Sequence, residues 1–164
     1  MTPNALKTVE VKALYEKHGA ALAAYGCCCG LDFASAEDVV QQVFLKLLEG
    51  NLSFVQTPLA YLYRSVRNAS LNLRRNFRRE AEMPAEEAWL VGSDGPREEA
   101  LAVQAALVDL PDEQKETVFL KVWAGMTLQE IAGVLEVPMN TVASRYRYAL
   151  EKLRERLQPV AGRY

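Results

Sequence analysis

The sequence predicts an all-α fold of two small helical domains joined by a flexible acidic linker. Almost every apolar pattern along the chain repeats at helical spacing, and strands are hard to place anywhere. Residues 80–97 combine acidic side chains with Gly and Pro, a composition typical of a linker. The chain closes with two helical patterns separated by a short interruption, as in a helix-turn-helix. We therefore expect domains at residues 1–80 and 98–164 and a linker at residues 81–97.

The first predicted helix covers Val9 to Cys29 and ends at Gly30, a residue typical of helix C-termini. Its apolar stripe consists of Leu14, Ala21, Leu22 and Tyr25. The second helix is expected to begin at a capping signal formed by Ser35 and Asp38 and to end at Gly50. The side chains expected to face inward are Val39, Val40, Val43, Phe44, Leu47 and Leu48. Those expected to face outward are Glu37, Asp38, Gln41, Gln42 and Lys46.

The third helix is expected to begin at Pro58, with Thr57 as its cap, because proline suits the first helical position. It runs toward Arg79 with Leu59, Leu62, Val66, Ala69 and Leu73 on its apolar side. Residues 1–79 carry 10 basic and 6 acidic side chains, whereas residues 80–100 carry 1 basic and 7 acidic side chains. The overall net charge of −2 therefore conceals a basic front domain.

The C-terminal domain is expected to contain about four helices. Helical pattern resumes near Arg97 and again at Pro111, where Asp112 and Glu113 suit the positive N-terminus of a helix. This domain ends in the two helices of the expected helix-turn-helix, which would place its second helix in a DNA groove.

The expected helix-turn-helix begins at Thr127, whose hydroxyl can form a capping box with Glu130. The apolar face of its first helix consists of Leu128, Ile131, Ala132 and Leu135. Glu136, Val137 and Pro138 then interrupt the pattern and place a proline near the start of the second helix. That helix turns Val142, Tyr146, Ala149, Leu150, Leu153 and Leu157 inward. The candidate DNA contacts are Asn140, Thr141, Ser144, Arg145, Arg147 and Tyr148, although a helical hairpin in an all-α core would show the same apolar pattern.

The composition gives no sign of catalysis, of a cofactor or of a metal site. His18 is the only histidine, and no phosphate-binding glycine loop or nucleophile motif is present. The adjacent Cys27, Cys28 and Cys29 are interpreted as small buried residues, the alternative being a redox or metal role with ligands from elsewhere. A signal segment and a bilayer-spanning apolar run are both missing, so we expect a cytoplasmic protein that is not inserted in a membrane.

Four stretches carry a family pattern: AEDVVQQVFLKL at residues 36–47, PLAYLYRSVRNASLNLRR at 58–75, LPDEQKETVFLKVWAGMTLQEIA at 110–132 and TVASRYRYALEKLR at 141–154. They resemble the sigma factors of bacterial RNA polymerase, specifically the extracytoplasmic-function (ECF) group. By this resemblance the first stretch docks on the coiled coil of the polymerase's largest subunit. The second captures the melted promoter element, and the last two form the domain that contacts the upstream promoter element.

The resemblance implies three sets of binding residues. Those for core polymerase are Glu37, Asp38, Gln41, Gln42 and Phe44. Those for the melted element are Phe54, Tyr61, Arg64, Arg67, Asn68, Asn72, Arg75 and Arg78, with the arginines on phosphates. In the C-terminal domain Ala143 and Tyr148 depart from the family pattern, so Ser144, Arg145 and Arg147 are the best candidates for contact with the upstream element. The acidic linker would thread the RNA exit path of the polymerase.

The function expected from the resemblance is promoter-specific initiation of transcription by core RNA polymerase, without catalytic activity of the chain itself. The expected partners are core polymerase, promoter DNA in double-stranded and melted form, and an anti-sigma factor. Two alternatives remain open at this stage. One is a stand-alone helix-turn-helix regulator, against which the acidic composition argues. The other is a sigma-like decoy that titrates an anti-sigma factor.

Overall fold

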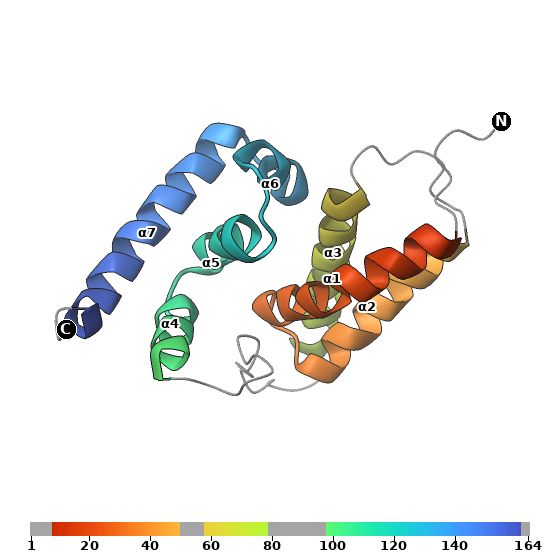
Figure 1. Ribbon diagram of the computed structural model, residues 1–164, viewed down its shortest axis with the longest axis horizontal. Helices are drawn as coiled ribbons and strands as arrows, with labels where there is room; N and C mark the ends of the chain where they lie inside the picture. Colours follow the sequence, from red (N-terminus) through yellow and green to blue (C-terminus); the bar gives the residue numbers. More distant parts are fainter. Residues whose placement is uncertain (1–7, 50–57, 79–97, 162–164) are drawn as a thin grey trace. The chain divides into compact units, whose positions relative to one another are not determined.

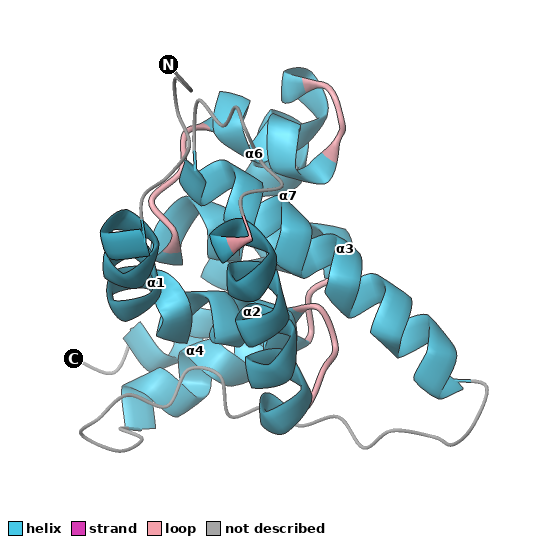
Figure 2. Ribbon diagram, turned by 90° about the vertical axis from the view of Figure 1, so that its right-hand side faces the viewer, coloured by secondary structure: helices cyan, strands magenta, loops and turns pink. Residues whose placement is uncertain are grey.

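The computed structural model describes residues 8–49, 58–78 and 98–161, and these form helices and connecting turns without a strand (Figure 2). The chain divides between Glu86 and Glu87 into two compact units. The described part of each unit is built from helices alone, which confirms the predicted all-α fold. The acidic linker expected at residues 81–97 lies outside the described residues.

The described part of the N-terminal unit contains α1 (Thr8–Cys28), α2 (Phe33–Leu48) and α3 (Pro58–Arg78), and each helix packs against the other two (Figure 1). Its core holds the almost fully buried Leu22, Tyr25, Val40, Leu62, Tyr63 and Val66. The rings of Tyr25 and Tyr63 meet edge to face with their centroids 5.3 Å apart. Burial raises the pKa of the Tyr63 hydroxyl to about 12. Tyr63 therefore belongs to the core and is not available to a ligand.

The turn between α1 and α2 corrects the predicted start of the second helix. Gly30 closes α1 with a φ of 106°, a conformation that glycine adopts without steric cost. This closing turn is so short that Asp32 becomes the cap of α2, with its carboxylate accepting a hydrogen bond from the Ser35 N–H at 3.2 Å. The prediction that Ser35 and Asp38 form the cap was wrong, because both already lie within the helix that Asp32 starts.

Two leucines that were predicted to face inward are exposed. Leu48 is 46% exposed and Leu150 is 38% exposed. Leu150 follows the fully buried Ala149, and one step along an α-helix turns a side chain by about 100° away from the buried face. Leu48 lies in the last turn of α2, where it borders an apolar groove between α2 and α1.

The described part of the C-terminal unit contains α4 (Glu98–Val108), α5 (Asp112–Val118), α6 (Leu128–Leu135) and α7 (Met139–Ala161). These four α-helices agree with the predicted number of about four. A π-helical segment, η1 (Phe119–Trp123), continues α5 and was not predicted. The Ala124 N–H bonds there to the Phe119 carbonyl at 3.1 Å, five residues earlier. Helix α7 packs against α4, α5 and α6. Its Ala149 shares a core with Leu107, Leu110 and Val118.

Gly26 marks a close contact between α1 and α2, because a Cβ built on it would lie 2.9 Å from the Cβ of Ala36. We expect Gly26→Ala to lower the free energy of unfolding of the N-terminal unit by about 1–3 kcal/mol through overpacking. Gly19→Ala is the matched control on the same helix, since its added methyl would approach only the Tyr15 ring, at 3.6 Å. The control should raise stability by about 0.5–1 kcal/mol, because alanine favours the helix.

Thiol labelling in increasing urea measures this difference in the full chain. All three cysteines, Cys27, Cys28 and Cys29, are free and buried in the N-terminal unit, so their labelling reports the unfolding of that unit alone. The urea midpoint should fall for Gly26→Ala and rise for Gly19→Ala. Equal midpoints for the two variants would contradict a role for the close contact.

Candidate nucleic-acid interface

The helix-turn-helix begins at a capping box that fixes the first turn of α6. The Thr127 hydroxyl accepts a hydrogen bond from the Glu130 N–H at 3.1 Å, and the Glu130 carboxylate accepts one from the Thr127 N–H at 3.1 Å. This confirms the predicted start of the helix. Ile131 and Leu135 are buried one and two turns further on. The cap and the buried face together fix where the following turn leaves α6.

The turn between α6 and α7 is tight and strained at one residue. Glu136 adopts the left-handed conformation, with a φ of 57°, and its N–H bonds to the Ala132 carbonyl. Helix α7 begins at Met139, and the carbonyl of the preceding Pro138 accepts a hydrogen bond from the Val142 N–H at 3.2 Å. Proline was expected near the start of this helix and lies one residue before it. The short turn sets the direction in which α7 leaves α6.

The exposed face of α7 lies opposite its buried face. Val142 and Ala149 are fully buried. The candidate DNA contacts on this helix divide into the exposed Asn140, Arg147 and Tyr148 and the half-buried Thr141 and Ser144. The Arg147 guanidinium lies 5.2 Å from the centroid of the Tyr148 ring, a cation–π contact. Amide, hydroxyl, guanidinium and aromatic groups on one exposed face are those that contact base edges and phosphates.

Arg145, the remaining candidate on α7, has an intramolecular partner. Its Nη2 lies 3.8 Å from Oε2 of Glu113, in the first turn of α5. The Arg145 side chain is 23% exposed, whereas that of Glu113 is 70% exposed. Sequence reasoning did not link these residues, because their proximity follows from the packing of α5 against α7.

The candidates for the melted promoter element form a stripe along α3. The helix places Tyr61, Arg64, Asn68, Asn72 and Arg75 three or four residues apart, which aligns them along one side. Tyr61 is half-buried and the other four are exposed. Arg67 is half-buried and stands beside this stripe. The helix includes Arg78, whose side chain is not described, and Phe54 lies outside the described residues.

The candidates for core-polymerase binding occupy the exposed side of α2, with one exception. Glu37, Asp38, Gln41 and Gln42 are exposed as predicted from the sequence pattern. Phe44 is only 4% exposed and meets the Tyr15 ring edge to face, with the centroids 5.1 Å apart. The Phe44 ring is thus largely used in joining α2 to α1.

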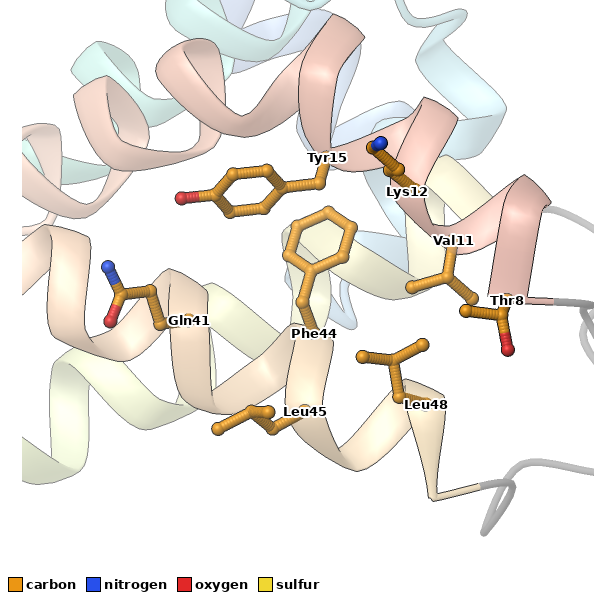
Figure 3. A pocket seen from close by; sticks show the side chains of 8 residues that line it. All are labelled: Thr8, Val11, Lys12, Tyr15, Gln41, Phe44, Leu45 and Leu48. Carbon is orange, nitrogen blue, oxygen red and sulfur yellow. The ribbon is translucent and has the colours of Figure 1, made fainter.

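An apolar groove between α1 and α2 borders that polar face, a feature that sequence reasoning missed. Figure 3 shows the Tyr15 ring of α1 next to the Phe44 ring of α2 in its lining. Its lining residues are Thr8, Val11, Lys12, Tyr15, Gln41, Phe44, Leu45 and Leu48. Leu45 is 56% exposed and Leu48 is 46% exposed. Exposed leucines at the edge of an apolar groove are typical of a protein-binding surface.

The cysteines and the histidine form no candidate metal centre. Cys27, Cys28 and Cys29 are buried and free of disulfides. Within residues 8–49, 58–78 and 98–161, no three His, Cys, Asp or Glu side chains gather closely enough to hold a metal ion. His18 lies on α1, where partial burial and then the neighbouring Lys17 lower its pKa. None of the described helices is both long enough and apolar enough to cross a membrane.

The chain has two all-helical units, and the C-terminal unit contains a helix-turn-helix, a motif typical of DNA-binding proteins. Comparisons with known families refine this class. The family described as Sigma-70 region 2 matches residues 14–80, and the one described as Sigma-70, region 4 matches residues 100–153. The chain therefore belongs to the sigma-70 family of RNA polymerase sigma factors, within its ECF group. It is a promoter-directing factor, and the two alternative functions are not favoured.

Individual relatives support this assignment. The chain is 30% identical over 141 residues to the ECF RNA polymerase sigma-E factor of Haemophilus influenzae, covering 75% of each chain. It is 29% identical over 157 residues to the ECF RNA polymerase sigma factor SigL of Mycobacterium tuberculosis, covering 90% of this chain and 89% of the relative.

Solved structures share the fold. The sigma factor RpoE of Bartonella quintana, solved in complex with the anti-sigma factor NepR, aligns with a TM-score of 0.72 at 22% identity, covering 90% of this chain and 98% of RpoE. CnrH, solved in complex with the cytosolic domain of CnrY, aligns with a TM-score of 0.66 at 26% identity. The alignment covers 93% of this chain and 90% of CnrH.

We expect the thiol of Cys27 to make the stability of the N-terminal unit fall at alkaline pH. Burial, and secondarily the Asp32 carboxylate, raise the pKa of this thiol from 9.0 to about 11. Because the folded state favours the protonated thiol, this contribution is present below pH 9.0 and is lost as the pH rises toward about 11. Urea unfolding followed by circular dichroism should show a lower midpoint at about pH 10 than at about pH 8. The fall in the urea midpoint should be smaller in Cys27→Ala than in the unsubstituted chain. An equal fall in both proteins would show that a group other than Cys27 causes it.

Proposed function

We propose that this sigma factor divides promoter recognition between its two units. The N-terminal unit binds core polymerase through α2 and holds the melted promoter element on α3. The C-terminal unit contacts the double-stranded upstream element through α7. We place the unit boundaries at residues 1–80 and 98–164, with the segment between them as the tether. The observation that carries the proposal is the exposed polar face of α7, held outward by the burial of Val142 and Ala149.

Contact with the upstream element is assigned to the N-terminal half of α7. A recognition helix contacts base edges with its first turns. Asn140 and Ser144 lie in the first two turns, and their amide and hydroxyl groups can pair with base edges. Arg147 and Tyr148 follow one turn later, where a guanidinium can reach guanine or a phosphate.

Capture of the melted element is assigned to the stripe on α3. Holding a base outside the stack costs a few kcal/mol, which stacking and edge hydrogen bonds must offset. Asn68 and Asn72 supply donors and acceptors for base edges, and Tyr61 supplies a ring on which a base can stack. Arg64 and Arg75 supply charge for the phosphates. The same helix keeps Leu62 and Val66 in the core, so the stripe rests on a rigid support.

Core-polymerase binding is assigned to the polar face of α2 together with the groove beside it. The face presents Glu37, Asp38, Gln41 and Gln42. The groove adds Leu45 and Leu48, whose exposed surface would be removed from water on binding. A polar rim beside an apolar centre is the usual anatomy of a protein interface.

The chain's contribution is binding and positioning, and the chemistry of transcription belongs to the polymerase. We place its action in the cytoplasm, together with the polymerase. The similar RpoE was solved with an anti-sigma factor, and we propose that a protein of this kind restrains this chain as well. The tether between the units would occupy the RNA exit path.

Reconstituted transcription tests the proposed function. The purified chain is incubated with bacterial core RNA polymerase and fragmented genomic DNA, and the 5′ ends of the transcripts are mapped. Discrete starts that require the chain and share two spaced upstream motifs are the expected result. Stable binding to core without specific starts would instead indicate a decoy. Failure to bind core would indicate a stand-alone regulator.

Arg147→Ala should weaken the contact with the upstream element. An arginine paired with guanine supplies about 1–3 kcal/mol of discrimination between bases. The ratio of initiation with an intact upstream motif to initiation with a scrambled one should therefore fall by roughly 10-fold or more. Arg154→Ala is the matched control, because Arg154 is an exposed arginine on the same helix beyond its N-terminal half. The measurement compares initiation on promoters with an intact or a scrambled upstream motif. Equal effects of the two variants would contradict the assignment.

Leu45→Asp should weaken binding to core polymerase by about tenfold or more, because it places a charge in the apolar part of the proposed interface. Val9→Asp is the matched control, since Val9 is 78% exposed on α1 but does not line the groove. Binding is measured by titrating core polymerase with the labelled full chain. A similar loss in both variants would show that the groove has no special role.

A further inference from the structure

Arg145 lies beside the buried face of α7 and not on its exposed face. At about 100° per residue, it lies roughly 60° around the helix axis from the fully buried Val142, whereas Ser144 lies roughly 160° away. Its side chain is 23% exposed, in keeping with this position. Arg147, which points away from the core, is exposed. Arg145 and Arg147 therefore occupy different environments on the same helix.

The backbone of Glu113, the partner of Arg145, is held within α5, and its carboxylate lies at the surface. Glu113 lies in the first turn of α5, where the buried Thr117 hydroxyl donates a hydrogen bond to its backbone carbonyl at 2.8 Å. Its carboxylate reaches Arg145 across the contact between α5 and α7, at 3.8 Å. Below the pair, Val118 of α5 and Ala149 of α7 share the apolar core. The pair thus connects the outer edges of two helices whose inner faces are already packed together.

We propose that Arg145 is a positioning residue, which holds α7 against α5 through Glu113 and leaves base contact to the exposed face of the helix. The proposal rests on the assignment of α7 to the upstream promoter element. An ion pair at the edge of the contact between α5 and α7 limits rotation of α7 about its buried face, from which Tyr146 and Leu153 also pack against the core. Rotation of α7 would displace Asn140, Ser144 and Arg147 together relative to the groove.

Charge reversal separates positioning from direct DNA contact. Glu113→Arg and Arg145→Glu each replace the attraction by repulsion, whereas the double variant restores an ion pair with its ends exchanged. If Arg145 touched DNA, a glutamate there would repel phosphates whatever its partner. The readout is initiation by the reconstituted holoenzyme on a promoter with an intact upstream motif, divided by initiation with that motif scrambled. All variants are compared at a temperature where circular dichroism shows each to be folded.

Each single reversal should lower this ratio about threefold to tenfold, and the double variant should return it to within about twofold of the unsubstituted chain. A loss in Arg145→Glu and in the double variant, with no loss in Glu113→Arg, would overturn the proposal in favour of direct DNA contact. Unchanged ratios in all variants would overturn it as well. If a reversal lowered the thermal stability without changing the ratio, the ion pair would stabilise the fold without positioning α7 for DNA. That result would also contradict the proposal.

Asp112→Arg is the matched control for the added charge. Asp112 is the neighbour of Glu113 in the same turn and pairs with Lys115 of the same helix at 3.8 Å. This control adds the same charge near the DNA and should not lower the ratio. If initiation by the unsubstituted chain did not depend on any upstream motif, the proposed function itself would be refuted. Failure of the proposed function can therefore be told apart from failure of the proposal for Arg145.

The salt dependence of promoter binding by the holoenzyme supplies a second readout. Removal of a phosphate contact lowers the slope of log K against log salt by about 0.9. Arg145→Gln should leave this slope unchanged, because Arg145 is assigned to Glu113 and not to DNA. A slope lowered by about 0.9 would overturn the proposal.

Discussion

The burial of Val142 and Ala149 determines which face of α7 is exposed, and the DNA contact proposed for the C-terminal unit depends on it. Helix α7 packs against α4, α5 and α6, so that its buried stripe is the meeting point of the unit. Because a helix turns by about 100° per residue, fixing one stripe in the core leaves the opposite stripe facing solvent. The capping box of α6 and the left-handed Glu136 fix the two ends of α6, and the first turn of α7 that follows exposes Met139 and Asn140.

The N-terminal unit follows the same rule with a different outcome on its outer surface. Close packing at Gly26, together with the edge-to-face pair of Tyr25 and Tyr63, joins three helices in a small core. This core includes the Tyr63 and Ser70 hydroxyls, for which the described residues provide no hydrogen-bond partner, and each such group costs about 1–3 kcal/mol. The surrounding apolar burial must offset that cost. The outward sides of α2 and α3 remain free to carry binding residues.

Charge is distributed to suit binding even though the chain as a whole is slightly acidic. The arginines cluster toward the end of α3, and the recognition helix carries Arg147 on its exposed face. The DNA contact proposed for these arginines would therefore be local, with specificity set by a few side chains and not by the overall field. Such limited charge fits a protein that binds promoters as one part of a larger complex.

The sequence by itself determined the order of the helices and some of their starts, because these depend mainly on residues close together in the chain. The box of Thr127 and Glu130 and the start of α3 at Pro58 were predicted for that reason. The candidate contacts on α7 followed from the helix-turn-helix pattern, and those on α2 and α3 came from the family resemblance. Their exposure was largely as the apolar pattern indicated.

Only the tertiary structure decided the remaining features. The cap at Asp32 depends on how tightly α1 closes, and the exposure of Leu48 depends on the groove beside α1. The pairing of Arg145 with Glu113 joins residues from different helices. No local pattern encodes such contacts, because they arise from the geometry in which separate helices pack.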